Sequence, residues 1–110
     1  MCIFCKIVKR EIPAQIVFED DNVIAFNDIA PKAPTHIVVI PKEHVKSATE
    51  VVDSGLWSWF MDAALQVVEK LDLDKQGYRF VINTGEHGGQ TVPHLHLHIL
   101  AGRNLGWPPG

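Results

Sequence analysis

The chain has 110 residues, of which 46% are hydrophobic, enough for one compact domain (residues 1–110) with a modest core and too few for two. The formal net charge is −3 and the lysines and arginines are scattered, which argues against a protein that binds nucleic acid through its charge. The sequence contains neither an apolar run that could span a membrane nor a signal-peptide pattern at its start, so we expect a cytoplasmic protein with no membrane partner.

A short helix and a hairpin are predicted for the first part of the chain. Apolar positions recur with helical spacing over residues 4–11, and Pro13 ends this segment, so we expect a short amphipathic helix that flanks the core. Residues 15–19 and 23–27 are rich in β-branched and aromatic side chains. The Asp20-Asp21-Asn22 turn between them predicts an antiparallel hairpin.

The middle of the chain predicts a loop, a strand and one long helix. Residues 29–35 contain two prolines, which cannot donate to a strand ladder, and we expect a loop there before a strong strand at 36–40. Apolar residues recur about every 3.6 positions over residues 55–71, the period of an α-helix. Asp53 or Ser54 is available as the N-cap of that helix.

The last third predicts two strands joined by a glycine-rich loop. The strands are expected at residues 78–83 and 93–100, and the loop at 85–90. Strands connected mostly by turns, with one long helix to cover a face, describe an α+β domain built on an antiparallel sheet.

The final strand carries three histidines at alternate positions. Residues 94–100 read His-Leu-His-Leu-His-Ile-Leu. Because a strand turns successive side chains to opposite faces, His94, His96 and His98 would share one face at a spacing of roughly 7 Å, with the aliphatic residues between them in the core. Imidazole changes charge near neutral pH, binds metals and acts as nucleophile or base, so this face is the candidate reactive site.

These residues fit the His-φ-His-φ-His-φ-φ signature of the histidine triad superfamily, where φ is apolar. The chain resembles the Hint branch, the histidine triad nucleotide-binding proteins, in four further blocks: residues 4–13, 25–36, 88–90 and 107–110. The resemblance implies a five-stranded antiparallel sheet with one long helix and a short N-terminal helix. It also implies a two-fold homodimer, in which the long helix and the following strand of each subunit meet their counterparts.

Two features bear on the homodimer. Trp57, Trp59 and Phe60 give the long helix more aromatic surface than one core stripe needs, although these rings equally suit the core of a monomer. The closing Trp107 and its Pro-Pro-Gly tail would reach toward the partner's active site, where the alternative is a frayed terminus.

His96, at the centre of the ladder, is the candidate nucleophile. A neutral imidazole can attack an electrophilic phosphorus and divide one difficult displacement into two easier ones through a phosphorus–nitrogen intermediate. His98 and His36 are the candidates to fix its tautomer and to stabilise charge on the non-bridging oxygens, helped by backbone N–H groups around Gly89.

The loop before the histidine strand is a candidate phosphate site. Gly88 and Gly89 allow the backbone to approach a phosphate closely, and Gln90 and Thr91 supply side-chain hydrogen bonds. Thr91 stands where many Hint proteins carry a serine that hydrogen-bonds the leaving amine, and its hydroxyl can do the same. Pro93 replaces an often aromatic residue, a difference without a chemical explanation here.

The resemblance also implies an activity and a binding site. The activity is hydrolysis of purine nucleoside phosphoramidates or related amine or acyl conjugates, which releases AMP or GMP through a nucleotidylated His96. Asp28 would hydrogen-bond the ribose hydroxyls and Asn83 would touch the phosphate–ribose region. The purine pocket would be lined by an apolar set: Ile3, Phe4, Ile7, Phe26, Ile29 and Val38.

Two other classes remain open from the sequence. Alternate histidines on a strand also hold catalytic zinc or iron, although that interpretation lacks carboxylate ligands. A nucleotide-binding or sensor module without turnover is the third class.

Cys2 and Cys5 form a C-x-x-C spacing that suits metal ligation. With His44 and His94 they supply the Cys₂His₂ set that tetrahedral zinc prefers, and the resemblance implies such a structural zinc, one per chain and not needed for catalysis. A redox role is weaker because no thioredoxin-like βαβ pattern surrounds the pair, and free buried thiols are the remaining alternative.

Overall fold

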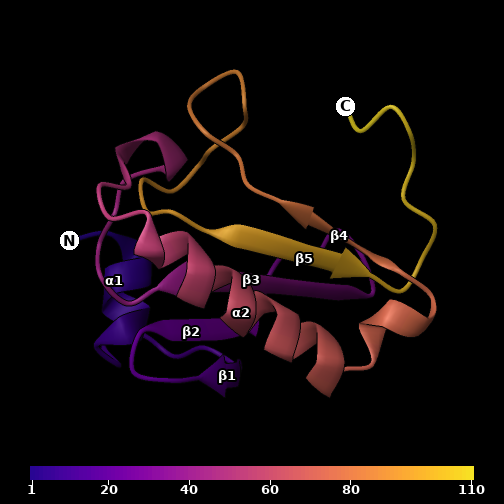
Figure 1. Ribbon diagram of the computed structural model, residues 1–110, viewed down its shortest axis with the longest axis horizontal. Coiled ribbons are helices and arrows are strands. Elements are labelled where there is room, and N and C mark those ends of the chain that lie inside the picture. The colour runs from indigo at the N-terminus through magenta and orange to yellow at the C-terminus, as the bar shows by residue number, and fades with distance from the viewer.

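The computed structural model describes all 110 residues and places two helices on opposite faces of one antiparallel sheet (Figure 1). The sheet has five strands in the order β1-β2-β3-β5-β4, and every neighbouring pair is antiparallel. The predicted α+β class and five-stranded sheet are therefore confirmed. The strands are β1 (Ile16–Glu19), β2 (Val23–Asn27), β3 (Thr35–Pro41), β4 (Tyr78–Val81) and β5 (Leu97–Ala101). No helix has the length and apolar character needed to cross a bilayer.

The long helix α2 (Gly55–Lys70) covers one face of the sheet and builds the main core. Its residues Leu56, Phe60 and Val67 pack against the odd-numbered positions of the central strands, such as Val39 and Ile99. Ser54 is the N-cap residue but its side chain makes no capping hydrogen bond, and the Oδ1 of Asp53 accepts one from Gly55 N–H at 2.9 Å instead. Short 3₁₀ turns, Ala48–Glu50 and Leu73–Lys75, flank the helix.

The short helix α1 (Ile3–Val8) lies on the opposite face and closes a second, smaller core. Ile7 of α1 is buried against even-numbered strand residues, including Phe26 and Val38. Adjacent residues of β2 and β3 therefore enter different cores. Both strands read as continuous apolar runs, the pattern expected when both faces of a strand are covered.

Helix α1 ends earlier than predicted, and Pro13 does not end it. Arg10 adopts a left-handed conformation with φ of 62°. Its N–H donates to Ile7 O and the next N–H, of Glu11, donates to Lys6 O, which is the hydrogen-bond pattern of a Schellman motif. The helix is thus closed by its own last turn.

The predicted strand at 93–100 is too long, because β5 begins only at Leu97. The N–H of His94 donates to Val92 O and that of Leu95 donates to Val45 O, so these backbone groups serve a turn and a loop contact instead of a strand ladder. The rings of His94 and His96 nevertheless both contact α1, where Phe4 packs against each of them. The strand predicted at 78–83 is also shorter and ends at Val81.

Candidate active site

A mainly apolar pocket of about 250 Å³ lies between α1 and the sheet. All six residues of the predicted purine pocket line it, together with Asp28, Thr91, His96 and His98. Ile29 stands at its mouth with 98% of its surface exposed, so it is free to pack on a ligand. The segment after α1, Ile12 to Ala14, also contributes to the wall and was not predicted to do so.

A second, more polar hollow of about 430 Å³ adjoins this pocket. It is lined by Lys32, His36, Asn83 and Gly89, among others, and shares Asp28, Thr91 and His98 with the apolar pocket. The two hollows thus meet at a carboxylate, a hydroxyl and an imidazole. This arrangement suits a ligand with an apolar ring at one end and a polar group at the other.

Hydrogen bonds fix the tautomers of His36 and His98. The backbone N–H of Lys32 donates to His36 Nδ1 at 3.0 Å, so that nitrogen carries no proton and His36 Nε2 does. Nε2 lies 2.9 Å from His98 Nδ1, to which it donates, and His98 then holds its own proton on Nε2. Asp28 Oδ2 lies 3.5 Å from His36 Nε2 on the same side. His98 Nε2 makes no hydrogen bond to the protein and is a free donor.

Both of these histidines are neutral near pH 7. Burial lowers the pKa of His98 to about 4, since the charged ring would lose its hydration, and the neighbouring His96 and His36 add to the effect. Burial likewise lowers the pKa of His36, although the Asp28 carboxylate opposes the shift. The donor at His98 Nε2 is therefore a neutral imidazole.

His96 has the opposite tautomer. Its Nδ1 lies 2.7 Å from the backbone oxygen of His94, which can only accept, so Nδ1 carries the proton. Nε2 then holds the lone pair and makes no hydrogen bond to the protein. Because no buried side-chain nitrogen in the structure lacks a partner, Nε2 must reach the pocket that His96 lines.

The glycine-rich loop is shaped by close backbone contacts. A Cβ at Gly88 would lie 2.3 Å from Thr84 O, so only glycine fits there, and Gly89 has a positive φ of 80°. The Gln90 side chain, predicted to bind phosphate, instead holds the loop. Its Oε1 accepts from Gly85 N–H, and its Nε2 donates to the carbonyls of Lys46 and Val92. Gln90 lines neither hollow of the active site.

The four predicted metal ligands converge beside this site. The donor atoms of Cys2, Cys5, His44 and His94 all lie within 4.8 Å of one another. Their six separations range from 3.1 Å, between the two Nδ1 atoms, to 3.7 Å. A regular tetrahedron around zinc has edges of about 3.3–3.8 Å for nitrogen and sulfur ligands. The four donors therefore fit one zinc ion.

The environment of His94 favours ligation. Its Nε2 lies 2.9 Å from Pro41 O, to which it donates, so Nδ1 is left unprotonated and directed at the cysteines. The ring is fully buried, and this burial lowers the pKa of His94, which keeps it in the neutral form that binds metal.

A second group of possible ligands, Asp28, His36 and His98, lies in the active site. Here the ring nitrogens already serve each other, because His36 Nδ1 accepts from Lys32 N–H and Nε2 donates to His98. Both imidazoles would have to give up these bonds or change tautomer to chelate an ion. This group is poorly prepared for a metal compared with the cysteine-containing cluster.

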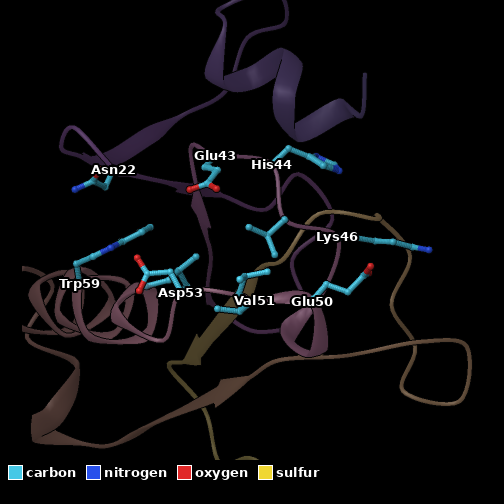
Figure 2. Close-up of a pocket in the computed structure, with 11 residues that line it drawn as sticks. Asn22, Glu43, His44, Lys46, Glu50, Val51, Asp53 and Trp59 are labelled. Carbon is cyan, nitrogen blue, oxygen red and sulfur yellow. The ribbon is translucent and has the colours of Figure 1, made fainter.

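The backbone groups that set these tautomers are Lys32 N–H, Pro41 O and His94 O. None was predicted, because main-chain atoms leave no signal in a sequence. Another hollow, of about 540 Å³, lies by the start of α2 and is lined by Glu43, Glu50 and Asp53 (Figure 2). His44, on the side nearest α1, is its only predicted site residue, so this hollow is separate from the histidine ladder.

Comparison with known proteins agrees with this geometry. The model of the HIT domain family matches residues 9–105. The chain is 50% identical over 110 residues to a HIT-like protein of Synechococcus elongatus, covering 98% of this chain and 96% of that one. It is 43% identical over 106 residues to the purine nucleoside phosphoramidase of Escherichia coli, covering 94% and 89%. The crystal structure of a HIT family hydrolase from Legionella pneumophila superposes with a TM-score of 0.96 at 47% identity, and all of both chains is covered. The chain belongs to the HIT domain family.

Proposed function

We propose that the protein is a Hint-type purine nucleoside phosphoramidase. It hydrolyses conjugates in which AMP or GMP is joined to an amine or acyl group, and it releases the nucleoside monophosphate. The observation that carries the proposal is His96, whose Nδ1 is held by a backbone carbonyl and whose Nε2 faces the pocket without a protein partner. The similarity to the E. coli purine nucleoside phosphoramidase supports the reaction type.

The two hollows divide the substrate between them. The purine packs in the apolar pocket between Phe4 and the rim residue Ile29, and the ribose hydroxyls hydrogen-bond Asp28. The phosphate lies where the hollows meet, within reach of Thr91 and His98. The leaving group extends into the polar hollow. Asn83 and the backbone near Gly89 line that side.

The reaction proceeds in two displacements at phosphorus. His96 Nε2 attacks, the phosphorus–nitrogen bond to the amine breaks, and the amine leaves with a proton drawn from solvent through the Thr91 hydroxyl. The neutral His98 donates its Nε2 proton in a hydrogen bond to a non-bridging oxygen, where charge develops. Water then attacks phosphorus, the bond to His96 breaks, and AMP is released. The net change is one conjugate plus one water to AMP plus the free amine.

A structural zinc held by Cys2, Cys5, His44 and His94 is part of the proposal, one per chain. A closed four-ligand site of this kind holds structure and does not activate water. The convergence of the four donor atoms supports the site, and the absence of His96 from this group of ligands supports catalysis without a metal step.

Incubation with adenosine 5′-phosphoramidate in excess chelator tests the proposed function. Turnover that persists at saturating substrate supports covalent histidine catalysis, whereas turnover that vanishes and returns with added metal supports a metal hydrolase. Nucleotide binding without turnover in either condition indicates a sensor module. Acid quenching and peptide mapping should then locate AMP on His96, and an adduct at another residue would contradict the assigned nucleophile.

We also propose a homodimer in which the C-terminal tail approaches the partner's active site. Arg79 of the edge strand β4 donates to Leu105 O and Gly106 O, which fixes the tail up to that point. Trp107 beyond it is 82% exposed and free to contact a partner. Sedimentation at micromolar concentration should give a dimer, and a monomer would contradict the proposal. Deletion of residues 104–110 should change the preference among leaving groups.

A further inference from the structure

We infer that His94 and Phe4 are positioning residues that couple metal binding at the Cys2–Cys5–His44–His94 cluster to nucleotide binding in the active site. A metal ion in the cluster raises the affinity for AMP, and AMP raises the affinity for the metal. The inference rests on the proposed function for the identity of the nucleotide and adds a link between two sites that the reaction itself does not require.

The first connection runs through the main chain of His94. Its ring Nδ1 belongs to the metal cluster, while its backbone oxygen holds Nδ1 of His96 at 2.7 Å. The residue is fully buried, so its ring and its carbonyl cannot move independently. The next N–H, of Leu95, donates to Val45 O at 2.6 Å, which ties this segment to the residue after His44. A displaced cluster would therefore shift the carbonyl that orients the nucleophile.

The second connection runs through Phe4, which lies between Cys2 and Cys5 in the sequence. Its ring packs edge-on against His94 and His96, with centroid distances of 5.9 and 5.1 Å, and it also lines the apolar pocket. The first turn of α1 is closed by Cys2, whose Sγ accepts from Cys5 N–H at 3.3 Å. An ion that holds both thiols holds the turn on which Phe4 sits.

The sign of the coupling follows from the partial burial of this turn. Helix α1 has six residues, of which only Ile7 is buried; Phe4 packs on the second core but is only partly buried, and Ile3 is 50% exposed. Without an ion, the nucleotide must order the turn as it binds, which costs affinity; with the ion bound, that ordering is already present. Because linkage is reciprocal, the metal raises the affinity for AMP by the same factor by which AMP raises the affinity for the metal. Such coupling factors between two sites typically lie at roughly 5–150-fold.

Calorimetry of the full-length protein measures this factor. AMP should bind the zinc-loaded protein at least about fivefold more tightly than the metal-free protein, and zinc competition experiments with and without AMP should give the same factor. The Phe4→Leu variant keeps all four ligands and an apolar wall, and the factor should fall below that of the wild type, because only the connection through the His94 main chain remains. Phe18→Leu is the matched control, since Phe18 packs against the main core and lines neither site, and its factor should equal that of the wild type.

Cobalt-substituted protein gives a second readout that does not depend on a folded metal-free form. Its thiolate-to-cobalt absorption bands should shift when AMP is added and saturate with the AMP binding curve. Equal AMP affinities with and without zinc, or cobalt bands unchanged at saturating AMP, would overturn the inference. Both measurements use binding alone, so a protein that couples the sites but does not turn over substrate would refute the proposed function and leave the inference standing.

Discussion

The neutral state of His98 should make folding stability depend on pH in a defined direction. Its pKa is about 4 in the folded protein and is taken as about 6.5 in the unfolded chain, so the unfolded state binds more protons between these values. Stability should therefore rise with pH through this window and be lost as pH falls from 6.5 toward 4. Between pH 7 and pH 5, a pKa shift of this size lowers the free energy of unfolding by about 1.8 kcal/mol. Discounting for the partial exposure of the ring reduces this loss to roughly 1 kcal/mol.

Urea unfolding at pH 7 and pH 5 in excess zinc measures this loss in the wild type and in His98→Gln. The glutamine removes the titrating ring and still offers an oxygen to His36, so its loss of stability should be smaller by that amount. Titration of the His98 ring by NMR gives its pKa directly. A ring pKa near 6.5, or equal losses in the two proteins, would refute the reasoning from burial.

Three further outcomes are expected. His96→Ala should lower phosphoramidate turnover by roughly 10⁴-fold or more, while AMP binding in calorimetry stays largely intact, because the ring supplies the covalent step and only part of the pocket. Turnover near the wild-type rate would exclude His96 as nucleophile. At a zinc concentration about 1,000-fold above its Kd, Cys5→Ser should lower the melting temperature in calorimetry by roughly 15 °C, and chelator should lower that of the wild type equally. An unchanged melting temperature, or metal analysis that finds no zinc, would contradict the site. Gly88→Ala should destabilise the protein to urea by about 1–3 kcal/mol, since the new Cβ would meet Thr84 O, whereas Gly106→Ala, in open space, should be neutral.

Features that depend on side-chain chemistry or on the periodicity of apolar residues could be predicted from the sequence. The long helix was predicted at residues 55–71 and lies at Gly55–Lys70, because burial of its apolar stripe leaves one solution. The apolar residues of the purine pocket were implied only by the resemblance to the Hint branch, and they line one pocket. The four metal ligands, distant in the sequence, were predicted as a set from their residue types and from the resemblance, and their donor atoms meet.

Prediction failed where main-chain geometry decides. The histidine ladder was predicted as regular strand, but its first half is shaped by hydrogen bonds to Val45 and Val92 that no side-chain pattern reveals. Gln90 resembled a phosphate ligand in the sequence, yet nearby carbonyls occupy its amide. The end of α1 depended on Arg10 entering a left-handed conformation, which arginine rarely adopts and a sequence pattern does not indicate.

The interleaving of the two cores has a consequence for how the molecule comes apart. Val38 and Val39 are neighbours in β3 but belong to the cores under α1 and α2 respectively. Neither core can lose its order without disturbing a strand that the other needs, so both should melt in one cooperative transition. We expect the amide hydrogens at the centre of β3, paired with strands on both sides, to exchange with solvent only through global unfolding, whereas those of the edge strand β1 exchange through smaller openings.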